Sequence, residues 1–116
     1  MSASKLDGLT FLVVEDEPLI AIDISMSLED AGAKVTTTTT LKHAMLLVEH
    51  DGLAGAIVDH SLGDGDSAAL RTRLKVRGVP FLVYSGFKAQ GEPYLSKPAT
   101  PEQLIKALEK LIARRA

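Results

Sequence analysis

Residues 9–16 read LTFLVVED, a short apolar run that ends on the acid pair Glu15 and Asp16. A continuous apolar run is typical of a parallel strand that is covered on both faces. Pro18 follows, as suits the first turn of a helix, and apolar residues then recur at helical spacing until Gly32. This stretch predicts a buried strand followed by a helix, with two carboxylates at the C-terminal end of the strand.

The same alternation of strand and helix continues along the chain. Further strands are predicted at residues 34–39, 54–58, 80–84 and 94–96. Helices are predicted over 41–48 and from an N-cap at Asp66 through Leu74. A last amphipathic helix is predicted to carry on one face Leu104, Ile105, Leu108, Leu111 and Ile112. The five threonines at 36–40 favour an edge strand that is partly exposed to water. Strands that alternate with helices predict a parallel sheet with helices on both of its faces.

One connection is too short for this pattern. Only nine residues, 85–93, separate the strands predicted at 80–84 and 94–96, whereas a helical crossover needs about 10–12 or more. Two glycines and a proline in this segment also disfavour a helix. We therefore expect the fourth helix to be absent or reduced to about one turn.

Composition narrows the class of protein. The 116 residues are 46% hydrophobic and 24% charged, which suits a single globular domain over 1–116 without an effector module. The net charge of −2 and an aromatic content of 4% give no reason to expect nucleic acid or membrane as a partner. The absence of cysteine excludes disulfides and thiolate chemistry, and the lack of a long apolar run or signal peptide makes a cytoplasmic location the expectation.

Polar residues of particular types follow the apolar runs. They are the pair Glu15 and Asp16, then Asp59, Ser85 and Lys97. In an open α/β sheet, ligands bind at the C-terminal ends of the strands. Carboxylates suit Mg²⁺, while a lysine and a hydroxyl suit phosphoryl oxygens. With Asp59 as nucleophile, the set predicts formation of an aspartyl phosphate.

Four short motifs in this order resemble the receiver domains of two-component response regulators. They are LVVEDEP at 12–18, IVD at 57–59, YSG at 84–86 and YLSKP at 94–98. The resemblance spans almost the whole chain. It implies a flavodoxin-like (CheY-like) doubly wound α/β fold with a five-stranded parallel sheet in the order 2-1-3-4-5.

The resemblance also implies roles for the acids. Asp59 corresponds to the phosphoacceptor, which takes a phosphoryl group from a sensor histidine kinase. Glu15, Asp16 and Asp59 would hold Mg²⁺, together with the backbone carbonyl of Ser61. Apart from its own phosphorylation and dephosphorylation, the domain would not be an enzyme.

The remaining residues of the family pattern would read the phosphorylated state. Lys97 would pair with the phosphoryl group, and a cis peptide bond before Pro98 would aim it into the site. Ser85 would be the switch hydroxyl and Tyr94 the switch aromatic, although core or edge packing of Tyr94 without switching stays an alternative. We expect the 86–93 loop to become ordered on phosphorylation and to switch together with the strand that follows it, in place of a helix shift.

The segment 83–87, VYSGF, resembles an atypical subgroup of stand-alone receivers in alphaproteobacteria, whose motif is Phe-Ala-Thr-Gly-aromatic. The match is partial, with Tyr84 for alanine and Ser85 for threonine. This likeness implies a kinase of the HWE or HisKA2 type; the sequence does not identify the output protein.

Two other functions fit parts of the same pattern. A small aspartate-nucleophile phosphatase of the haloacid dehalogenase type would need an acid two residues after the nucleophile, where Ser61 stands. A receiver-like binding module without phosphorylation would not need the complete set of acids, hydroxyl and lysine.

Overall fold

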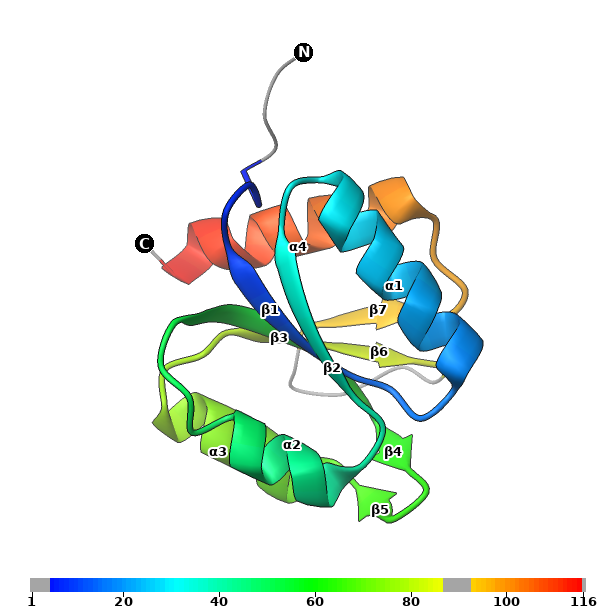
Figure 1. Ribbon diagram of the computed structural model, residues 1–116, viewed down its shortest axis with the longest axis vertical. Helices are drawn as coiled ribbons and strands as arrows, with labels where there is room; N and C mark the ends of the chain where they lie inside the picture. The colour runs from blue at the N-terminus through cyan, green and yellow to red at the C-terminus, as the bar shows by residue number, and fades with distance from the viewer. Residues whose placement is uncertain (1–4, 87–92, 116) are drawn as a thin grey trace.

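The computed structural model describes residues 5–86 and 93–115, and its main sheet lies between two layers of helices (Figure 1). The strands are β1 (Thr10–Val14), β2 (Lys34–Thr38), β3 (Leu53–Asp59), β4 (Ser61–Leu62), β5 (Gly65–Asp66), β6 (Phe81–Ser85) and β7 (Tyr94–Ser96). The helices are α1 (Pro18–Asp30), α2 (Leu41–Leu47), α3 (Ala68–Val76) and α4 (Pro101–Arg115).

The main sheet has five parallel strands in the order β2-β1-β3-β6-β7. Without the short β4 and β5, this is the predicted order 2-1-3-4-5, which is confirmed. β4 and β5 form a small antiparallel hairpin where the sequence indicated only a loop.

Each strand of the sheet interior contributes to two cores. On β1, Leu12 and Val14 pack with α2 and α3, whereas Phe11 and Val13 pack with α1 and α4. Figure 1 shows these two pairs of helices on opposite faces of the sheet. Burial on both faces explains why β1 is a continuous apolar run without polar alternation. It is this double cover that holds the strand ends in place.

The edge strand β2 and the helix before it follow the prediction. Thr36 and Thr37 are exposed on β2, as expected of a wet edge, while Thr38 is buried. Beyond the end of α1, Gly32 adopts a φ of 90°, and a Cβ there would lie 2.1 Å from a carboxylate oxygen of Asp7. Only glycine meets both conditions without a shift of its neighbours.

The predicted N-cap of α3 was wrong. Ser67, and not Asp66, occupies the N-cap of α3. The carboxylate of Asp66 still accepts a hydrogen bond from the backbone N–H of Ala68 at 2.9 Å. Asp66 pairs with Ser61 in the hairpin, and this pairing moves the helix start by one residue.

The prediction of a missing fourth helix falls mostly on residues 87–92, which lie outside the described residues. The described parts of the chain contain four helices, and residues 86–93 connect β6 to β7.

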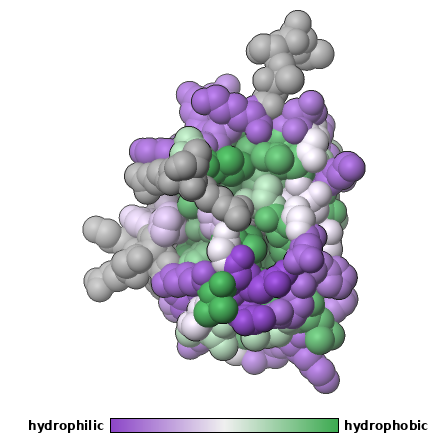
Figure 2. Space-filling model, turned by 90° about the vertical axis from the view of Figure 1, so that its left-hand side faces the viewer, coloured by the Kyte–Doolittle hydropathy of each residue, from purple (hydrophilic) through white to green (hydrophobic). Residues whose placement is uncertain are grey.

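Within the described residues, no helix has the length and apolar character needed to cross a membrane. The side on which β3 and β6 begin carries hydrophilic residues around smaller hydrophobic areas (Figure 2).

Candidate functional site

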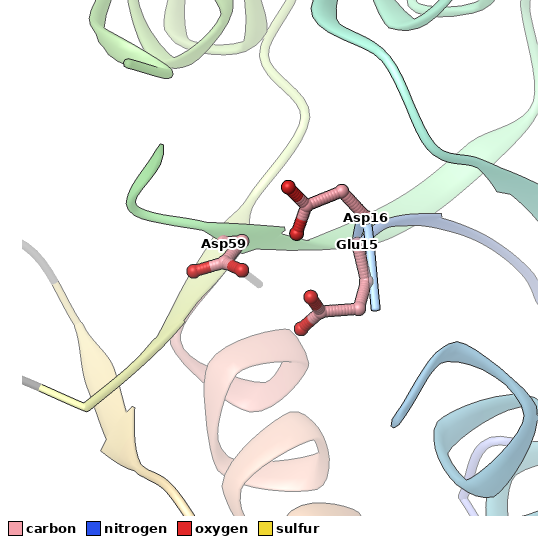
Figure 3. Close-up of side chains that lie close together, drawn as sticks. All are labelled: Glu15, Asp16 and Asp59. Carbon is pink, nitrogen blue, oxygen red and sulfur yellow. The ribbon is translucent and has the colours of Figure 1, made fainter. Parts of the chain in front are cut away.

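Three carboxylates meet where β1 and β3 end. Glu15 and Asp16 follow β1 directly, and Asp59 is the last residue of β3. The strands are hydrogen-bonded neighbours with Val14 opposite Val58, so their ends lie side by side. One oxygen from each of the three carboxylates lies within 4.8 Å of the others. Figure 3 shows Glu15 and Asp16 projecting from the end of β1 toward the side on which Asp59 lies.

Lys97 joins two of these acids. Its Nζ lies 2.9 Å from Oε1 of Glu15 and 3.0 Å from Oδ2 of Asp59. The backbone N–H of Lys97 donates to the carbonyl of Ser85 at 2.9 Å, which attaches the end of β7 to the end of β6. The peptide bond between Lys97 and Pro98 is cis, as the resemblance implied. The strand order thus brings residues 38 positions apart into contact.

Burial and charge oppose each other at this cluster. Glu15 is 1% exposed, and burial raises its pKa, as does the neighbouring Asp59, against hydrogen bonds from Lys97 and the backbone N–H of Glu17. Burial alone would lower the pKa of Lys97, but its contacts with Glu15 and Asp59 outweigh burial and raise it. The lysine therefore stays charged at neutral pH.

The donor set fits a divalent cation such as Mg²⁺. Three carboxylates face one ammonium group, so the site has an excess of negative charge near oxygens that Mg²⁺ prefers as ligands. Within the described residues, Lys97 forms ion pairs with Glu15 and Asp59 but not with Asp16, so the lysine does not compete for the oxygens of Asp16. The residues present are therefore suited to hold the ion that the sequence predicted.

The β4–β5 hairpin lies beside the acids. A Cβ added at Gly63 would be 3.9 Å from Oδ2 of Asp16, so the hairpin backbone runs close to the cluster. Both the backbone N–H and the hydroxyl of Ser67 donate to the carbonyl of His60, at 3.0 and 2.9 Å, and close the base of the hairpin. Ser61 begins β4 with an exposed side chain, and metal binding by its carbonyl stays a prediction.

The hairpin is also attached to α2. The carboxylate of Asp64 accepts hydrogen bonds from the backbone N–H groups of Leu41 and Lys42, at 3.0 and 3.2 Å. These two bonds lower the pKa of Asp64. This contact could not be predicted from the sequence, because an aspartate in a polar Gly-Asp-Gly segment indicates a turn and does not indicate which helix its side chain will contact.

The two predicted switch residues occupy different places. Ser85 is 1% exposed at the end of β6, the strand between those that carry Asp59 and Lys97. Tyr94 begins β7 opposite Val83 and is half-buried against the core on the α2 and α3 side. Ser85 thus belongs to the site, while Tyr94 lies outside the acidic cluster and its switching role stays a prediction.

Tyr84 is a residue of the site that sequence reasoning missed. In the sequence, Tyr84 stands out only because it replaces the alanine of the Phe-Ala-Thr-Gly-aromatic motif. Its hydroxyl accepts a hydrogen bond from the backbone N–H of Ala99 at 3.0 Å, and its ring centroid lies 5.4 Å from the Nζ of Lys97. A tyrosine at an otherwise apolar strand position was the available signal, because a buried hydroxyl needs a partner.

Known proteins with similar sequences include regulators of transcription. No family model matches the chain. It is 28% identical over 124 residues to the probable transcriptional regulatory protein TcrX of Mycobacterium tuberculosis, a match that covers 95% of this chain and 53% of that protein. The chain therefore spans about half the length of curated relatives of this kind.

Solved structures resemble the chain over nearly its full length. SdrG of Sphingomonas melonis Fr1 is 32% identical with a TM-score of 0.79, and the match covers 97% of this chain and 99% of SdrG. The receiver domain of the sensor histidine kinase PA1611 of Pseudomonas aeruginosa PAO1 has a TM-score of 0.83 at 23% identity, covering 91% and 98%. That receiver was crystallised with a magnesium ion coordinated in its active-site cleft.

Proposed function

We propose that this chain, which belongs to the receiver domains of two-component response regulators, accepts a phosphoryl group on Asp59 from a sensor histidine kinase. The observation that carries the proposal is the position of Lys97, whose ammonium lies 3.0 Å from Asp59 and 2.9 Å from the buried Glu15. The oxygens of an incoming phosphoryl group carry negative charge. A cation beside the acceptor carboxylate is in position to compensate this charge.

The transfer needs little beyond positioning. A carboxylate oxygen of Asp59 attacks the phosphorus of a phosphohistidine, the P–N bond breaks, and its electron pair returns to the imidazole. The product is an acyl phosphate on Asp59. Lys97 then pairs with a phosphoryl oxygen, and Ser85 at the end of β6 supplies a hydroxyl for another. Hydrolysis of the acyl phosphate returns the domain to its starting state.

Mg²⁺ is the proposed cofactor. Glu15, Asp16 and Asp59, with the backbone carbonyl of Ser61, would hold it. When bound, the ion supplies positive charge to the phosphoryl oxygens during transfer. The acidic cluster supports this assignment, and so does the likeness to a receiver domain that contains magnesium.

The remaining parts of the proposal concern partners and output. We place the domain in the cytoplasm, with a kinase of the HWE or HisKA2 type as donor and a protein as output partner. The signal would pass through Ser85, Tyr94 and β7; the part of it assigned to residues 87–92 lies outside the described residues.

A phosphatase of the haloacid dehalogenase type is disfavoured, because Ser61 occupies the position where that class needs an acid. The chain would catalyse only its own phosphorylation and dephosphorylation.

Intact mass measurement after incubation with acetyl phosphate and Mg²⁺ tests the proposal. The wild-type chain is expected to gain the mass of one phosphoryl group, and Asp59→Asn to gain none, because an amide is not nucleophilic. Asp66→Asn, the same change outside the acidic cluster, serves as the matched control and should react like the wild type. An unmodified wild type or a modified Asp59→Asn would contradict the proposal, and steady turnover of phosphomonoesters would favour the phosphatase.

A further inference from the structure

We propose that Tyr84 is a positioning residue that holds Lys97 against Asp59; the inference deepens the proposed function and rests on it. Tyr84 lies on β6, which is the strand between β3 and β7. Its backbone pairs with Asp59 on β3 and with Leu95 on β7, so one residue contacts the strand of the acceptor and the strand that leads to the lysine.

The hydroxyl of Tyr84 fixes the chain just beyond Lys97. It accepts a hydrogen bond from the backbone N–H of Ala99 at 3.0 Å, two residues after the lysine. On the other side, the backbone N–H of Lys97 itself donates to the carbonyl of Ser85 at 2.9 Å. The backbone that carries the ammonium is therefore held at two points, and β6 supplies both acceptors.

The ring of Tyr84 adds a second constraint. Its centroid lies 5.4 Å from the Nζ of Lys97, within the range of a cation–π contact. Glu15 and Asp59 lie 2.9 and 3.0 Å from the same nitrogen. The ammonium thus has two carboxylates and an aromatic ring as neighbours, and the tyrosine limits how far it can leave the acids.

Packing of the core does not require the hydroxyl of Tyr84. Tyr84, Lys97 and Ala99 line a groove of about 950 Å³ between α1 and α4. Ala99 is half-buried and lines this groove, so we expect water from the groove to take the place of the tyrosine hydroxyl as the acceptor for its N–H in Tyr84→Phe. Phenylalanine would fill the same core volume. Tyr84→Phe should therefore leave the fold intact and loosen only the segment that carries Lys97.

Chemical modification of the metal-free protein tests the proposal without any phosphorylation. The acylation rate of Lys97 by an N-hydroxysuccinimide acetate is measured by peptide mass mapping, with the exposed Lys42 as internal reference. Tyr84→Phe is expected to raise the rate of Lys97 about fivefold relative to Lys42, as expected for loss of one neutral hydrogen bond. Thr100→Ala, which removes the hydroxyl that caps α4 one residue further on, should leave the ratio unchanged.

Phosphorylation by acetyl phosphate then separates positioning from structural support. Tyr84→Phe should slow the wild-type reaction about fivefold, yet change the rate by less than about 1.5-fold in a Lys97→Met background, because the tyrosine acts through the lysine. If Lys97→Met reacts too slowly, the same cycle is measured on the affinity for beryllofluoride. An equal loss in both backgrounds, or an unchanged acylation ratio, would overturn the inference. A wild type that takes no phosphoryl group would contradict the proposed function alone, since the acylation ratio does not depend on it.

Discussion

The ammonium of Lys97 lies between two carboxylates, 2.9 Å from Glu15 and 3.0 Å from Asp59, and this contact determines the charge balance of the site. Glu15 is almost completely buried, so its charge is far from water. A buried charge is tolerated only when a partner compensates it. At the scale of single residues, the lysine therefore supports stability by compensating the buried charge of Glu15.

Lys97→Met should lower the free energy of unfolding at pH 7 by about 1–3 kcal/mol, because it leaves Glu15 and Asp59 without their cation. Urea denaturation would measure the loss. Adding Glu15→Gln to this variant removes the uncompensated buried charge and should recover part of it. If the double variant is less stable than Lys97→Met, the charge explanation is wrong.

At the scale of elements, the β4–β5 hairpin connects β3 to α2. Asp64 accepts backbone hydrogen bonds from Leu41 and Lys42, while Ser67 donates two to the carbonyl of His60. The segment directly after Asp59 is therefore held at its tip and at its base. A stable hairpin keeps the backbone that passes Asp16 in one place.

The hairpin contact predicts a pH-dependent contribution to stability. The backbone bonds lower the pKa of Asp64 below its ordinary value of 3.8, so the contribution is present above that value and is lost as the pH falls through the lower folded value. Asp64→Ala should lower Tm by a few degrees at pH 7, and the difference from wild type should shrink below about pH 4. The exposed Asp23→Ala on α1 is the control. A constant Tm difference across this range would count against the role of the carboxylate.

At the scale of the whole molecule, the parallel arrangement brings the C-terminal ends of four strands to the same side of the sheet, those of β1, β3, β6 and β7. The core that covers both faces of the sheet holds these strand ends in place, so the acids are close together before any ligand binds. A site that is formed in the folded chain and absent from the unfolded chain couples ligand binding to folding.

Mg²⁺ should therefore stabilise the folded protein by mass action. At ten times the dissociation constant, the expected gain is about 1.4 kcal/mol, or about 5 °C in Tm for a domain of this size. Calorimetry with and without Mg²⁺ would measure it. Asp16→Asn should abolish most of the rise, since it removes a carboxylate of the cluster, while Asp30→Asn at the end of α1 should retain it. An equal rise in both variants would place the ion elsewhere.

Much of the fold could be predicted because its signals are local. The continuous apolar run of β1, the helical spacing of α1 and the glycine at its end each act within a few residues, and each was confirmed. The start of α3 was displaced because pairing of Asp66 with Ser61 across the hairpin overrode the local capping preference. The hairpin itself has only two residues in each strand, too few to produce a periodic signal.

By itself, the sequence determined the alternation of strands and helices and the presence of acids, a hydroxyl and a lysine at strand ends, since both depend on neighbours along the chain. Only the tertiary structure decided that Lys97 contacts both Glu15 and Asp59. The same is true of the hydrogen bond from the backbone N–H of Ala99, two residues after Lys97, to the hydroxyl of Tyr84. These contacts depend on which strands become neighbours and on the path of the chain beyond β7. Residues far apart in sequence have no local pattern that records such a pairing, so the folded sheet was needed to reveal it.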